Sequence, residues 1–111
     1  MKLLLDTHVL LWAAVQPARL SAAVRSMIDD AANDLLFSAA SIWEVAIKRS
    51  LGRADFTADP GLLRRGLIDN GYGELPVTSA HAAAVDGRPP IHKDPVERIL
   101  VAQAIIEGST L

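Results

Sequence analysis

The stretch 3-LLLDTHVLLW-12 begins like a buried strand and continues like a buried helix, and it decides the fold. A run of three leucines suits a strand that is covered on both faces, as in a parallel sheet. The segment from His8 to Val15 suits a short helix, with Thr7 as its candidate N-cap. Asp6 lies where strand and helix meet. Apolar runs rarely carry such a charge unless it is capped, paired or bound to a metal.

Size and composition restrict the class of protein. The chain has 111 residues, of which 50% are hydrophobic, so we expect one domain spanning 1–111. A net charge of −2 argues against a generic nucleic-acid-binding surface but leaves room for a local basic patch. The chain lacks cysteine, which excludes disulfides and thiolate metal sites. No secretory leader or membrane-spanning run is apparent, and we therefore expect a cytoplasmic protein without membrane association.

Strand-like and helix-like segments alternate along the rest of the chain. This alternation predicts right-handed crossovers and a parallel α/β sheet with helices on both faces. The polar, proline-rich segment 86–93 is expected to be a loop. We expect strands at 2–5, 33–38 and 74–77, a strand beginning at 109–111, and helices at 8–15, from Ser21 to Ala31, and at 40–51, 59–70, 78–85 and 94–108.

Acidic residues lie at three predicted helix starts. Asp6 ends the first strand, Glu44 lies one turn into the helix 40–51, and Asp94 and Glu97 open the last helix. Each has a purely structural alternative. Asp6 can cap its helix, "SIWE" fits a capping box with Ser41 as N-cap, and "DPVE" is a well-formed helix start.

Taken together, the four acids favour a metal site over three separate caps. In a parallel sheet these helix starts meet at one edge, where ligand sites form. Carboxylates crowded there raise one another's pKa unless a cation compensates them. Oxygen ligands suit Mg²⁺ or Mn²⁺ rather than zinc, and the three histidines, His8, His81 and His92, are expected on the surface or in loops.

Three segments, 3-LLLDTHVLLW-12, 38-SAASIWEVAIKRSLGR-53 and 92-HKDPVERILVAQAIIEGSTL-111, give the sequence its family resemblance. The chain resembles the PIN-domain family, specifically the VapC-type toxin ribonucleases of toxin–antitoxin pairs. The resemblance implies an endoribonuclease that uses Mg²⁺ or Mn²⁺ to cleave RNA. It assigns Asp6, Glu44 and Glu97 to the family's first, second and third acids, with Asp94 as an accessory carboxylate.

The sequence departs from the family pattern in two ways. The family usually has aspartate at the position of Glu97, and it continues beyond the residue that matches Leu111 through a strand with a further acid. We therefore expect a PIN-like sheet that lacks the usual C-terminal strand. A shortened chain, a partner that completes the fold and a degenerate member all remain open. The alternative function is a non-catalytic PIN-like binding module that acts through a protein partner.

Basic residues flank the acids and are candidate RNA contacts, although solvated surface charges are the simpler interpretation of each one. Trp12 and Trp43 are expected in the core rather than under nucleobases. The candidates are Lys48, Arg49 and Arg53 after Glu44, and Arg88, His92, Lys93 and Arg98 around Asp94.

The resemblance also implies partners. Family members are covered at the active site by a cognate VapB-like antitoxin and commonly form homodimers. The helix expected at 59–70 carries Leu62, Leu63, Leu67 and Ile68, which fit either an exposed groove or ordinary core.

Overall fold

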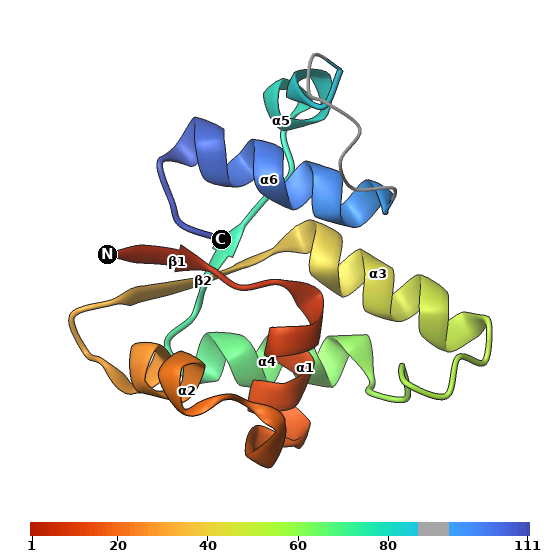
Figure 1. The fold of residues 1–111 in the computed structure, drawn as a ribbon. Coiled ribbons are helices and arrows are strands. Elements are labelled where there is room, and N and C mark those ends of the chain that lie inside the picture. The colour runs from red at the N-terminus through yellow and green to blue at the C-terminus, as the bar shows by residue number, and fades with distance from the viewer. Residues whose placement is uncertain (87–93) are drawn as a thin grey trace.

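The computed structural model describes residues 1–86 and 94–111, and it contains alternating strands and helices (Figure 1). None of the helices in these two ranges is long and apolar enough to cross a membrane. The elements are β1 (Lys2–Leu4), α1 (Thr7–Val15), the 3-10 turn η1 (Pro17–Arg19), α2 (Ala22–Asp29), β2 (Asp34–Ser38), α3 (Ala39–Ser50), α4 (Pro60–Asp69), β3 (Gly73–Leu75), α5 (Ser79–Ala84) and α6 (Pro95–Glu107).

The three strands form a parallel sheet in the order β1-β2-β3, which confirms the predicted α/β class. Leu3 pairs with Leu35 of β2 and, on its other side, with Thr110. The Thr110 N–H donates to the Lys2 carbonyl at 2.9 Å, and the Leu4 N–H donates to the Thr110 carbonyl at 2.7 Å. The segment expected to begin a strand at 109–111 therefore forms one parallel bridge along β1.

Side chains of β1 alternate between two hydrophobic clusters, one on each face of the sheet. Leu3 and Leu5 point into a cluster with Leu10 of α1 and Leu63 of α4. Leu4 points the other way, into a cluster that is built mainly by α6. Figure 1 shows α6 on one side of the strands and α1 and α4 on the other. The period of two along the strand therefore places helices on both faces, as predicted.

Two predicted helix caps are wrong by a few residues. Asp6, not Thr7, caps α1, and Ser38, not Ser41, caps α3. Both predicted caps lie inside their helices, Thr7 as the first residue of α1 and Ser41 as the third residue of α3, and there the Thr7 hydroxyl donates to the Ser41 hydroxyl at 3.0 Å. Asp6 is exposed directly before the start of α1, and Ser38 directly follows the buried Phe37, so each can accept a backbone N–H of the first helical turn.

Three predictions of burial are also wrong. Trp12, expected in the core, is half-buried and lies outside both hydrophobic clusters. Trp43 is 59% exposed, because the buried face of α3 is taken by Glu44 and Val45. His81, expected at the surface, is only 2% exposed. Its Nδ1 accepts the Thr78 N–H at 3.0 Å, which completes a capping box at the start of α5. The loop expected at 86–93 lies, apart from its first residue, outside the described residues.

Candidate active site

The starts of three helices share the carboxyl edge of the sheet. Helices α1 and α3 follow β1 and β2 almost directly, so both begin at this edge. Helix α6 leads to Thr110, which runs parallel to β1, so α6 also begins there and returns across the sheet (Figure 1). The topology thus brings the elements that carry Asp6, Glu44, Asp94 and Glu97 to the edge where parallel sheets form their sites.

Asp6 and Asp94 each cap a helix. The Val9 N–H donates to Asp6 Oδ1 at 2.9 Å, and the Val96 N–H donates to Asp94 Oδ1, also at 2.9 Å. A carboxylate at this position is stabilised by the unpaired amides and the dipole of the helix. Each of these two capping bonds uses only Oδ1 of its carboxylate. The same side chain can therefore cap a helix and also bind a cation.

Glu44 is the buried acid of the group, with 5% of its surface exposed. The capping-box interpretation fails for it, because α3 begins at Ala39 and Glu44 therefore lies in the second turn. Its carboxylate is paired with the Lys48 ammonium at 2.6 Å, one helical turn further on. A buried carboxylate needs such compensation, and the chain supplies it from the same helix.

Buried hydroxyl groups lie between the helices that carry Asp6 and Glu44. The hydrogen bond from Thr7 to Ser41 joins the first turns of α1 and α3, and both residues are at most 4% exposed. The side-chain oxygen of Ser38, which is fully buried, accepts the Ala40 N–H at 3.0 Å. This arrangement was not predicted from the sequence, although small hydroxyl residues next to the predicted strand ends were a signal for it.

The donor chemistry fits a hard divalent ion, although the acids do not form a complete cage. Among residues 1–86 and 94–111, no group of three or more His, Cys, Asp or Glu side chains is arranged to hold a metal ion. Mg²⁺ usually takes only one or two carboxylates and completes its shell with water and substrate phosphates. Asp6 and Glu44, on two contacting helices, meet that smaller requirement in kind and number.

The candidate RNA contacts on and after α3 are all near carboxylates. Each of these basic side chains therefore has a carboxylate of the same chain as an ion-pair partner. Apart from the first, these pairs are exposed and contribute little to stability. The pairs are Lys48 with Glu44 at 2.6 Å, Arg49 with Asp59 at 3.5 Å and Arg53 with Asp55 at 3.8 Å.

Of the four candidate RNA contacts around Asp94, the structure describes Arg98, which lies in α6. Arg98 is half-buried, and its Nη2 donates to the Val85 carbonyl at 3.5 Å. Its Nε is buried and has no hydrogen-bond partner among the described residues. The other three, Arg88, His92 and Lys93, lie outside the described residues. Arg98 therefore joins α5 to α6, which limits its reach toward a ligand.

The fold and this edge define a parallel α/β protein with an acidic site at the strand ends. The model of the PIN domain family matches residues 3–111, and the chain belongs to that family. Comparisons with curated proteins and with solved structures give no match. PIN domains are generally nucleases and typically use divalent metal ions.

Proposed function

We propose that the chain is a metal-dependent endoribonuclease of the VapC toxin type, acting as one cytoplasmic domain over residues 1–111. The observation that carries the proposal is Glu44, a carboxylate buried at the strand-end edge beside the helix that Asp6 caps. Burying a charge is costly, and Glu44 does not cap α3, so the helix itself does not require a carboxylate at this position. The PIN family supplies the reaction class, because its members are generally nucleases.

Asp6, Glu44, Asp94 and Glu97 are the residues proposed to hold Mg²⁺ or Mn²⁺. When bound, such an ion lowers the pKa of a coordinated water and offsets negative charge on the phosphate. The Lys48 ammonium is paired with the Glu44 carboxylate in the structure. A bound cation would therefore compete with Lys48 for this carboxylate or share its oxygens. Lys48, Arg49, Arg53, Lys93 and Arg98 are proposed to contact RNA phosphates, which positions the substrate without reading its sequence.

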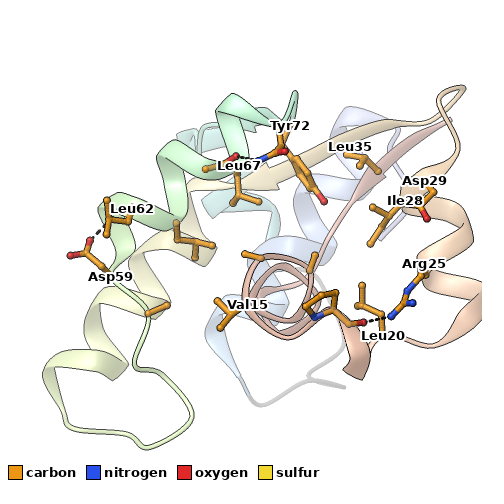
Figure 2. A pocket seen from close by; sticks show the side chains of 17 residues that line it. Val15, Leu20, Arg25, Ile28, Asp29, Leu35, Asp59, Leu62, Leu67 and Tyr72 are labelled. Carbon is orange, nitrogen blue, oxygen red and sulfur yellow. Dashed lines mark hydrogen bonds between the residues drawn. The ribbon is translucent and has the colours of Figure 1, made fainter.

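A groove between α1, α2 and α4 supports the proposal of a VapB-like antitoxin. Its volume is about 850 Å³, and Leu62, one of its lining residues (Figure 2), is 70% exposed, whereas the neighbouring Leu63 is buried. Burial, and to a smaller extent the charge of Asp29, raises the pKa of Tyr72 in the groove wall. The helix predicted at 59–70 thus provides both groove and core, and the groove suits the apolar face of a partner helix.

A stripe on α3 supports the proposal of a homodimer. Trp43, Ile47 and Leu51 follow one another at intervals of four residues and are 59%, 43% and 72% exposed. Residues at this spacing share one helix face. Large apolar side chains gathered on a surface commonly mark a protein interface, and the same stripe on a second copy is complementary by symmetry.

The test is cleavage of a structured RNA with Mn²⁺ or Mg²⁺ and with chelator. Asp6→Asn removes a charge at the carboxyl edge of the sheet, and Asp34→Asn makes the same change at the start of β2, at the opposite edge. Metal-dependent cleavage that Asp6→Asn abolishes and Asp34→Asn retains supports the proposal. A folded chain that cuts no RNA under any of these conditions contradicts it and favours the non-catalytic binding module.

A further inference from the structure

A row of aromatic and basic side chains begins at the buried acid of the site. The Lys48 ammonium that pairs with Glu44 also lies 4.7 Å from the centre of the Phe56 ring. The Phe56 ring meets the His8 ring edge-on, with 5.7 Å between their centres and 69° between their planes. Phe56 is 1% exposed and belongs to the core, whereas His8 is exposed.

The row continues outward along α1. His8 and Trp12 are four residues apart on the helix, and their ring centres are 6.0 Å apart. The guanidinium of Arg19, from the turn η1, lies 5.0 Å from the centre of the Trp12 ring. Trp12 is half-buried and Arg19 is exposed. We call His8, Trp12 and Arg19 the stacking row, and Phe56 supports it from the core.

The stacking row touches the core where the His8 ring meets Phe56. Neither His8 nor Trp12 belongs to the two hydrophobic clusters, and Arg19 has no carboxylate partner within an ion-pair distance among the described residues. The row nevertheless presents two aromatic rings followed by a planar cation, and it begins with His8, two residues after Asp6. Exposed rings and guanidinium planes of this kind are what unpaired nucleobases stack on.

We propose that His8, Trp12 and Arg19 bind one or two unpaired bases of a single-stranded RNA next to the acidic edge. The inference rests on the proposed RNA-cleaving function and adds a base-binding surface beside its site. The bases of a continuous duplex are already stacked and cannot offer their faces, so the row binds unpaired bases. Stacking of this kind tolerates any base, so the row positions the strand and does not read its sequence.

Binding is measured by fluorescence anisotropy of a labelled single-stranded oligoribonucleotide, with chelator present to prevent cleavage. A second oligonucleotide of equal length and charge has abasic sites in place of its bases. We expect Trp12→Leu to weaken binding of the base-bearing strand about 5- to 150-fold, the range for loss of one stacked base. Binding of the abasic strand stays the same, because its phosphate contacts are untouched.

Two matched variants protect the test against a folding defect. His8→Asn changes an exposed ring and should weaken only base-bearing RNA, and Arg19→Gln should do so more than Arg65→Gln, an equal change on α4. In Trp43→Phe, where Trp12 is the remaining tryptophan, base-bearing RNA should quench the fluorescence and the abasic strand should not. Equal weakening of both strands by Trp12→Leu, or no weakening of either, overturns the proposal.

Cleavage kinetics separate this inference from the proposed function. We expect Trp12→Leu to raise KM for single-stranded RNA and to leave kcat nearly unchanged, because the row binds substrate away from the reacting atoms. Cleavage with an unchanged KM refutes the stacking row and leaves the nuclease intact. Base-dependent binding without cleavage in Mn²⁺ refutes the nuclease and leaves the row intact.

Discussion

Asp6 combines a structural and a proposed catalytic role, and two substitutions separate them. Its Oδ1 accepts the Val9 N–H at 2.9 Å and caps α1. Asparagine keeps that acceptor and removes the charge, whereas alanine removes both. We expect Asp6→Ala to cost about 0.5–2 kcal/mol of folding stability, and Asp6→Asn to cost almost none, because Asn and Asp cap helices equally well.

The same pair predicts a different pattern in activity. Metal-ion catalysis is worth several kcal/mol, and each ~1.4 kcal/mol is tenfold in rate, so both variants should lose about 100-fold or more in cleavage. A loss of 1 kcal/mol in a domain of this size lowers Tm by about 3–6 °C, which calorimetry resolves.

Each result has a clear refutation. If Asp6→Asn cleaves RNA as fast as the unmodified chain, Asp6 is a cap and not a metal ligand. If Asp6→Ala melts at the unmodified temperature, the cap contributes nothing. Relief of charge repulsion is not expected to mask the loss, since Lys48 already compensates Glu44.

Three further outcomes follow from single contacts. Lys48→Met leaves Glu44 buried without its partner and should cost about 1–3 kcal/mol in chemical denaturation, whereas adding Glu44→Gln should recover most of the loss. The pKa of Asp59 is lowered, chiefly by the Leu62 N–H, so its stabilisation is present above the ordinary carboxyl pKa and is lost as pH falls through the lowered value. Asp59→Asn should therefore lose less stability than the unmodified chain in acid-unfolding curves, and a steeper loss would refute the assignment. Gly108 caps α6 with φ of 67°, so Gly108→Ala should lower stability by about 1 kcal/mol in thermal melts, and an unchanged Tm would contradict this.

The hydrophobic pattern predicted the helices and strands well, because buried side chains recur at the characteristic period of each kind of element. The continuous run at 3–5 and the run 35–37 gave buried parallel strands, and the capping pattern at Asp94 gave the start of α6 correctly. These signals are local, and the structure preserves them within a few residues. The alternation of strands and helices then restricted the topology to a parallel sheet.

Side-chain roles that depend on contacts distant in the sequence were not predictable in this way. Thr7 and Ser41 have the composition of caps, but they are 34 residues apart and hydrogen-bond to each other. Trp43 is apolar yet exposed, because helical periodicity identifies an apolar face without saying whether another element covers it. His81 is a different case, because its partner Thr78 is only three residues away: its ring takes the place that Glu or Gln usually has in a capping box, so the pattern was not recognised.

The acidic edge is intermediate between these cases. The expected sharing of one edge by Asp6, Glu44, Asp94 and Glu97 follows from topology, which the sequence pattern predicts. The pairing of Glu44 with Lys48 follows from their i, i+4 spacing. It was not predicted, because Glu44 was interpreted as a metal ligand and Lys48 as an RNA contact. Their roles toward metal and RNA remain predictions for the experiments above.

The alternation along β1 has a consequence for how this sequence tolerates insertions and deletions. Leu3 and Leu5 enter one cluster and Leu4 the other, so adding or removing one residue within this strand exchanges the two faces. The same shift moves Asp6 by one position relative to the end of the strand. A change of length in β1 therefore damages folding and the acidic edge together.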